Sequence, residues 1–122
     1  MQELRERKIG VYVRVSADEQ AKHGYSVRHQ FDVLQNVITN SGIGGVHNVR
    51  FYVDDGESGT TMDRPNFQRL LSDIKKGNVN LVMATDSERI GRENEYNSFW
   101  IKYLKAYNCE FYLHVFIVPI LV

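Results

Sequence analysis

The sequence predicts a three-layer α/β fold, in which helices cover both faces of a mainly parallel central sheet of four to five strands. Three observations predict it. Short apolar runs of strand length alternate with segments of helical period, the order begins and ends with a strand, and a polar loop follows each of the first three strands. The 122 residues suffice for one domain of this kind, spanning residues 1–122.

The composition is that of a globular protein, with 43% hydrophobic and 25% charged residues. Lysine and arginine balance aspartate and glutamate at 15 each, whereas a free-standing nucleic-acid binder usually has a basic excess. A single cysteine, Cys109, excludes an internal disulfide, favours a reducing cytoplasm, and lies among apolar neighbours typical of a buried structural thiol. No apolar stretch reaches the roughly 20 residues of a membrane span, so we expect no membrane association.

The first half of the chain predicts two strands around one helix. Residues 9–13 are rich in β-forming residues and read as a buried strand, and residues 50–54 read as a second strand. Between them Ser26 offers a helix N-cap, and residues 40–45 end the helix. The apolar stripe of this helix is formed by Val27, Phe31, Leu34 and Ile38.

The second half repeats the alternation. A polar loop at 55–62 leads to Pro65, which marks a helix start, and Gly77 supplies a left-handed cap at its end. Residues 81–84 form the third strand, residues 87–94 a polar connection, and residues 110–116 the fourth strand. The two helices carry the stripes Phe67, Leu70, Leu71, Ile74 and Tyr96, Trp100, Tyr103, Tyr107.

The polar loops hold the candidate functional groups, because the reactive site of such a sheet lies outside the carboxyl ends of its strands. Ser16 follows the first strand, and Arg14 lies two residues earlier, so both side chains project to one face. A serine at this position is usually a turn former or a helix cap. An arginine beside a hydroxyl nucleophile instead favours a phosphate substrate, because a guanidinium holds two phosphate oxygens.

The other two loops also contain arginines. Arg64 stands at the positive end of the helix that begins at Pro65, where a bound phosphate would offset the unfavourable dipole; a solvated surface arginine is an equal alternative. Arg89 and Arg92 share a face on a helical turn. Ordinary surface ion pairs are the alternative for these two, with Glu88, Glu93 and Glu95.

The remaining polar residues predict neither a metal nor a cofactor. The histidines and the cysteine lack the spacing of metal ligands, and the glycine-rich phosphate loops of nucleotide-binding folds are missing. A serine among several arginines suits covalent phosphoryl transfer, in which guanidinium groups offset the charge on the reacting phosphate.

Five short motifs follow one another from about residue 9 to the fourth strand. They are Arg14-Val-Ser16 with Gln20, Gly24-Tyr-Ser-Val-Arg-His-Gln30, Asp55 with Ser58-Gly59, Asp63-Arg-Pro65, and Glu88-Arg-Ile-Gly-Arg92. Each is weak alone, but five in register are specific. In this order they resemble the serine recombinases of the resolvase/invertase family. The segment at 24–30 is more similar to the large serine integrases and transposases of phages and mobile elements than to the small resolvases.

The resemblance implies that Ser16 attacks the scissile DNA phosphate, forms a phosphoserine bond to the 5′ end and releases a 3′ hydroxyl. Because the bond energy is retained, rejoining needs no ATP and no other cofactor. The family's active-site arginines, which bind the phosphate and stabilise its transition state, fall on Arg14, Arg64, Arg89 and Arg92. By the same resemblance, Arg89 is expected to help protonate the leaving oxygen. Supporting positions are Gln20, Gln30, Asp55, Ser58 and Glu88.

The resemblance also implies partners and a setting. Family members form dimers that assemble into synaptic tetramers on DNA, in a bacterial cytoplasm or encoded by a phage or mobile element. They continue after the fourth strand into a long helix and a DNA-binding region, whereas this sequence ends in the apolar tail 117–122. We therefore expect residues 1–122 to be a catalytic domain that contacts DNA through a full-length protein and does not recombine alone. Zero net charge fits this expectation.

Two alternatives remain beside recombination. The first is a catalytically inactive, truncated remnant or a regulatory partner of a full-length recombinase. It is favoured by the missing C-terminal region and by Glu88, where the family usually has aspartate, and opposed by Ser16 and the four arginines. The second is a nucleotide- or phosphate-binding domain of flavodoxin-like architecture with no recombinase role.

Overall fold

The computed structural model describes residues 7–16, 27–41, 48–56, 64–86, 89–91, 94–115 and 118–121. Strands and helices alternate through most of this part of the chain. In order they are β1 (Lys8–Ser16), α1 (Val27–Ser41), β2 (Asn48–Gly56), α2 (Pro65–Lys75), β3 (Leu81–Ala84), α3 (Asn94–Ala106), β4 (Glu110–Val115) and β5 (Val118–Leu121).

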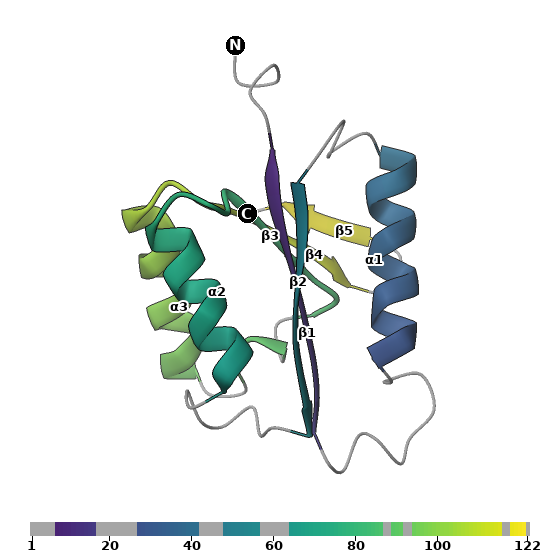
Figure 1. Ribbon diagram of the computed structural model, residues 1–122, viewed down its shortest axis with the longest axis horizontal. Helices are drawn as coiled ribbons and strands as arrows, with labels where there is room; N and C mark the ends of the chain where they lie inside the picture. The colour runs from purple at the N-terminus through teal and green to yellow at the C-terminus, as the bar shows by residue number, and fades with distance from the viewer. Residues whose placement is uncertain are drawn as a thin grey trace.

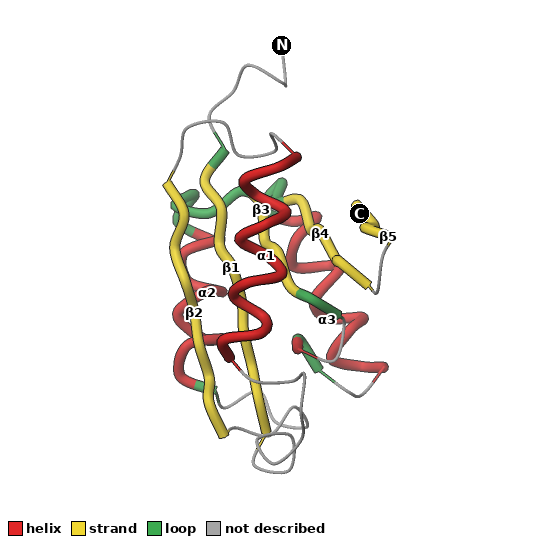
Figure 2. The backbone as a smooth tube through the Cα atoms, turned by 90° about the vertical axis from the view of Figure 1, so that its right-hand side faces the viewer, coloured by secondary structure: helices red, strands yellow, loops and turns green. Residues whose placement is uncertain are grey.

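The strands form one sheet in the order β2-β1-β3-β4-β5, in which the first four are parallel and β5 runs antiparallel to β4. Helix α1 covers one face, and α2 and α3 cover the other (Figure 1). Turned by 90°, α1 crosses in front of β1 and β3 (Figure 2). The predicted three-layer fold with a mainly parallel sheet is confirmed.

Two strands extend farther than the apolar pattern predicts. β1 and β2 pair in parallel along their whole length, from Lys8 opposite Asn48 to Ser16 opposite Gly56. Ser16 is therefore the last residue of β1. The sequence pattern placed it after the strand, and that prediction was wrong. The polar residues at the ends of both strands stay in the sheet because main-chain hydrogen bonds do not depend on side-chain polarity.

The apolar C-terminal segment is also part of the sheet. Residues 118–121 form β5 beside β4, with Tyr112 opposite Leu121 and Val115 opposite Val118. The sequence pattern suggested only a tail here. Pro119 is compatible with this position because β5 lies at the end of the sheet, where a strand needs hydrogen bonds on one side only.

Helix α2 shows the predicted start and end. Pro65 is its first residue, and its apolar stripe, residues 67, 70, 71 and 74, is buried. Gly77 has φ of 81°, the left-handed conformation that a helix end favours. Gly10 in β1 lets α2 come close, because a Cβ at Gly10 would lie 3.1 Å from the side chains of Leu70 and Val79.

The sheet has an apolar cluster on each face. The α1 side includes Val11, Val13 and Leu34, and the side of α2 and α3 includes Tyr12 and Trp100. Burial on both faces explains why β1 reads as a continuous apolar run before Arg14. Cys109 is buried as predicted, and burial, with a smaller contribution from the Glu110 charge, raises the pKa of its thiol to about 12.

Candidate active site

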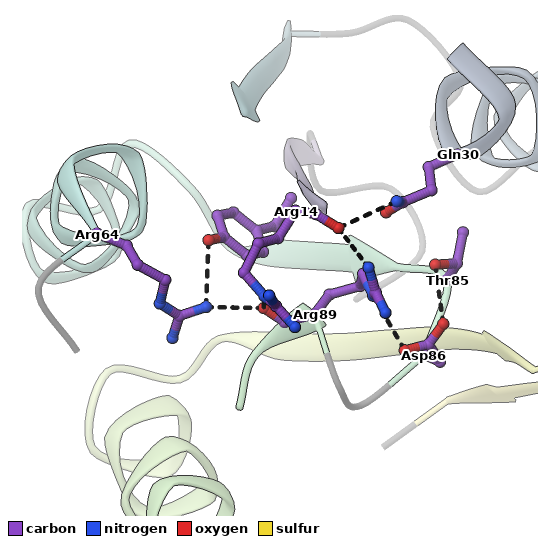
Figure 3. A network of polar contacts seen from close by, with 7 residues as sticks. Arg14, Gln30, Arg64, Thr85, Asp86 and Arg89 are labelled. Carbon is purple, nitrogen blue, oxygen red and sulfur yellow. Dashed lines mark hydrogen bonds and ion pairs between the residues drawn. The ribbon is translucent and has the colours of Figure 1, made fainter. Parts of the chain in front are cut away.

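Three of the predicted arginines are buried together near the carboxyl ends of β1 and β3. Arg14 and Arg64 are 0% exposed and Arg89 is 1% exposed. They come from β1, from the N-cap of α2 and from the segment after β3, and their guanidinium groups converge (Figure 3). Arginines are almost never this buried unless they are paired. The surface alternatives for Arg64 and Arg89 are therefore wrong.

The guanidinium of Arg64 points from the N-cap of α2 into the protein interior. Its Nη1 donates to the main-chain oxygen of Arg89 at 2.8 Å and to the hydroxyl of Tyr12 at 3.2 Å. Its Nη2 donates to the main-chain oxygen of Ile90. The guanidinium carbon also lies 4.2 Å from the ring centroid of Phe67. Arg64 thereby links the start of α2 to the segment that follows β3.

Arg14 and Arg89 hold each other's main chain. Arg14 Nε donates to the main-chain oxygen of Arg89 at 3.2 Å, and Arg89 Nη1 donates to the main-chain oxygen of Arg14. The same Arg14 oxygen accepts a hydrogen bond of 3.1 Å from Gln30 Nε2 of α1. Arg89 Nε forms an ion pair with Asp86 Oδ1 at 3.1 Å. These contacts join β1, α1 and the segment after β3 (Figure 3).

A carboxylate outside the predicted set of site residues lies next to Tyr12, the tyrosine that contacts Arg64. Asp54 is 3% exposed, while the predicted Asp55 is exposed. Asp54 Oδ1 accepts from the main-chain N–H of Asn66 at 3.0 Å. Its Oδ2 accepts from the N–H of Phe67 at 2.9 Å and from the hydroxyl of Tyr12 at 2.8 Å. Asp54, in β2, thus caps the N-terminus of α2, and its negative charge interacts favourably with the positive end of the helix dipole.

A signal for Asp54 was present in the sequence. Successive residues of a strand point to opposite faces, so Asp54 shares a face with Tyr52, two residues earlier, while Asp55 shares one with Val53. Tyr52 is buried in the cluster beneath α2. Alternation through the strand therefore places Asp54, and not Asp55, beneath α2.

Burial also determines the protonation state of the Tyr12 hydroxyl. Desolvation raises its pKa far above the ordinary value; the Arg64 charge opposes the rise, and the hydrogen bond to Asp54 adds to it. The hydroxyl is therefore protonated at neutral pH, donates its hydrogen to Asp54 and accepts from Arg64.

The other predicted residues are described only in part. The main chain of Ser16 ends β1 two residues after Arg14, and its side chain lies outside the described residues. Outside them also lie Gln20, Ser58, Glu88 and Arg92. Their roles, like the catalytic roles of the described arginines, stay predictions.

The described residues form neither a metal site nor a membrane span. No cluster of three or more histidine, cysteine, aspartate or glutamate side chains there is arranged to hold a metal ion. No helix in the described ranges combines the length and apolar character that crossing a membrane requires.

Comparison with known structures first defines the class of fold. The chain superposes on the N-terminal catalytic domain of TP901-1 integrase with a TM-score of 0.74 and 25% identity, covering 88% of this chain and 77% of that one. A resolvase-family site-specific recombinase from Streptococcus pneumoniae gives a TM-score of 0.66 and 26% identity over 88% and 70% of the two chains. The fold is that of recombinase catalytic domains.

Comparison with known sequences then gives the family. Residues 9–115 match the model of the resolvase N-terminal domain, so the chain belongs to the resolvase family. It is 36% identical over 77 residues to "Uncharacterized immunity region protein 3" of Bacillus phage phi105, covering 63% of this chain and 90% of that protein. It is 35% identical over 85 residues to the "Putative DNA recombinase" of Bacillus subtilis strain 168, covering 70% of this chain and 16% of that protein.

Proposed function

We propose that this chain is the catalytic domain of a site-specific DNA recombinase and that Ser16 is its nucleophile. The observation that carries the proposal is the buried arginine cluster of Arg14, Arg64 and Arg89, which starts two residues before Ser16. Three guanidiniums concentrate positive charge at the end of the sheet where a phosphate would bind. Family membership supports the same reaction class.

The proposed chemistry is a transesterification. The Ser16 oxygen loses its proton and bonds to phosphorus, the bond between phosphorus and the 3′ oxygen breaks, and the 3′ oxygen takes up a proton. The arginines offset the charge on the non-bridging phosphate oxygens as the transition state forms. Reversal by a new 3′ hydroxyl rejoins the strand, and because each step exchanges one phosphoester for another, no energy source is consumed.

The DNA partner and the assembly belong to the proposal as well. The chain spans 16% of its Bacillus subtilis relative, so the regions that grip DNA and join protomers into dimers and tetramers are proposed to lie outside this domain. The zero net charge supports this division, because phosphate neutralisation by basic residues supplies most DNA affinity.

A regulatory role is the second candidate. The 77 matched residues make up 90% of the phage phi105 protein but 63% of this chain, so that protein consists mostly of a segment similar to part of this domain, and its name places it in an immunity region. By analogy, this chain would associate with full-length recombinases and alter their assembly without cutting DNA itself.

A hybrid protein tests the first candidate. Residues 9–115 of this chain replace the matching segment of TP901-1 integrase, and the hybrid is incubated with the DNA that this integrase recombines. We expect a covalent protein–DNA adduct that disappears in Ser16→Ala and persists in Ser98→Ala, a matched change at an exposed serine of α3. An adduct that survives Ser16→Ala would sink the nucleophile assignment.

A hybrid that forms no adduct bears on the regulatory candidate. A folded hybrid that never forms an adduct, together with stable association between the 122-residue chain and its full-length Bacillus subtilis relative, would favour the regulatory role. Size-exclusion chromatography of the mixed proteins measures that association.

A further inference from the structure

We infer that Tyr12 and Asp54 are positioning residues for the arginine cluster: Asp54 holds the Tyr12 hydroxyl, which fixes Arg64 and, through it, the segment that carries Arg89. The inference deepens the proposed function and rests on it. It concerns two residues that the family motifs in the sequence did not select, and it is argued from their contacts.

The first link is the fixed carboxylate. Asp54 accepts two main-chain N–H groups from the first turn of α2, on Asn66 and Phe67, and one hydroxyl from Tyr12. Asn66 also donates its side-chain Nδ2 to the main-chain oxygen of Val53 at 2.7 Å. Contacts on both sides of the carboxylate leave it one orientation, so β2 and α2 form a rigid base for Tyr12.

The second link is the direction of the Tyr12 hydrogen bonds. A tyrosine hydroxyl has one hydrogen, and the Asp54 carboxylate can only accept. The hydrogen therefore points to Asp54, and the lone pairs of the Tyr12 oxygen face the Arg64 Nη1 at 3.2 Å. The ring is held edge-on to Phe67, with centroids 5.4 Å apart. The hydroxyl thus presents a fixed acceptor to a buried cation.

The third link runs from Arg64 to the segment after β3. One guanidinium donates to the main-chain oxygens of two successive residues, Arg89 and Ile90, while it stacks on Phe67. The Arg89 oxygen also accepts from Arg14 Nε. A rotation of Arg64 would release both carbonyl groups together, and the Arg89 guanidinium would lose its alignment with Arg14.

The chain supplies a matched control for Tyr12. Tyr52 lies opposite Tyr12 in the β1–β2 register and is also fully buried. Its hydroxyl donates to the carboxylate of Asp73 at 2.7 Å, on the same helix α2. Tyr52→Phe therefore removes the same kind of buried hydrogen bond as Tyr12→Phe, at a place where none of its described contacts reaches the arginine cluster.

The kinetic test uses the hybrid recombinase described above. For Tyr12→Phe we expect the rate constant of adduct formation to fall at least about tenfold, with the half-saturating DNA concentration changed less than about twofold. For Tyr52→Phe we expect both quantities to stay within about twofold. Equal losses in the two variants would mean that Tyr12 only stabilises the fold and would overturn the inference.

A second measurement does not depend on cleavage. In the 122-residue chain, the side-chain Nε–H signal of Arg64 is assigned in a ¹⁵N–¹H NMR spectrum by its loss in Arg64→Lys. We expect this signal and the Arg89 amide to shift, and the Arg64 signal to exchange faster with water, in Tyr12→Phe and in Asp54→Asn but not in Tyr52→Phe. Unchanged Arg64 and Arg89 signals in folded Tyr12→Phe would overturn the inference.

The two measurements separate this inference from the proposed function. A hybrid without a Ser16-dependent adduct contradicts the proposed function, and the NMR comparison still decides whether Tyr12 positions Arg64. An active hybrid whose Tyr12→Phe variant cleaves at the normal rate contradicts the positioning role alone.

Discussion

The guanidinium of Arg64 donates to the main-chain oxygen of Arg89 at 2.8 Å, across 25 positions of the sequence. One candidate catalytic arginine thus holds the main chain of another. The cluster of Arg14, Arg64 and Arg89 is consequently part of the packed interior as well as the proposed phosphate site. Substitutions in it are expected to change stability and activity together, which makes stability measurements necessary controls for every kinetic experiment.

Arg64→Lys tests the structural part of this double role. A lysine keeps the charge but cannot hold the two carbonyl groups and Tyr12 with a planar fork, so we expect the free energy of unfolding to fall by about 2 kcal/mol. Urea denaturation measures it. Arg69→Lys is the control, because Arg69 also stacks on an aromatic ring, that of Tyr52, but is exposed. Equal effects of the two substitutions would contradict the role given to Arg64.

Asp54→Ala and Asp55→Ala distinguish the two neighbouring carboxylates. Loss of Asp54 leaves the N–H groups of Asn66 and Phe67 and the Tyr12 hydroxyl without their acceptor, so we expect about 3 kcal/mol of destabilisation. Asp55 is exposed, and its loss is expected to cost less than about 1 kcal/mol, because interactions of exposed charges contribute little. Thermal and urea unfolding measure both, and the reverse order of effects would refute the assignment.

Asp73 makes the stability depend on pH. Burial acts to raise the pKa of its carboxyl, but hydrogen bonds from Tyr52 and Asn78 and the charges of Arg50 and Lys76 outweigh burial and lower it. A lowered pKa contributes stability that is present above the unfolded value of about 4 and is lost as the pH falls through the folded value.

The expected result for Asp73 is a difference between two acid titrations. Between pH 6 and pH 2 the unfolding free energy of the wild type should fall more than that of Asp73→Asn, which has no carboxyl to titrate. Urea midpoints at each pH measure it, and parallel curves would show that Asp73 contributes nothing to acid sensitivity.

The Cys109 thiol is expected to be unreactive in the folded chain. Burial raises its pKa to about 12, so little reactive thiolate exists at pH 8. Alkylation by iodoacetamide at pH 8 should be at least about 100-fold slower in the native state than in concentrated urea. Mass spectrometry follows the reaction, and similar rates in the two conditions would mean that the thiol is accessible.

The 122-residue chain is expected to bind duplex DNA weakly. With a net charge of zero it has little to gain from counterion release, so half-saturation at physiological salt should require more than about 100 µM protein. Fluorescence anisotropy of a labelled duplex measures it. Tight binding that changes little with salt would show that this domain carries its own DNA affinity, contrary to the proposal that the DNA-binding regions lie outside it.

Local patterns in the sequence predicted the elements well where one face of an element is apolar. Alternating strand and helix signals, Pro65 at a helix start and the left-handed Gly77 all follow from interactions within a few residues. The patterns were less accurate where pairing with a neighbouring strand decides whether a segment belongs to the sheet. Ser16 lies within β1 because β2 continues beside it, and residues 118–121 became a strand because the edge of β4 accepts them.

The order and spacing of the motifs were enough to predict arginines near Ser16 at the carboxyl ends of parallel strands, and Arg14, Arg64 and Arg89 do meet there. The hydrogen bonds that hold these arginines could not be predicted from the motifs, because they depend on tertiary packing. Asp54 rather than Asp55 faces α2, and Tyr12 joins it to Arg64, because these contacts depend on how β1, β2 and α2 pack against one another. A spacing along one chain brings residues to the same edge of a sheet, but hydrogen-bond partners are chosen by distances between elements, which folding alone establishes.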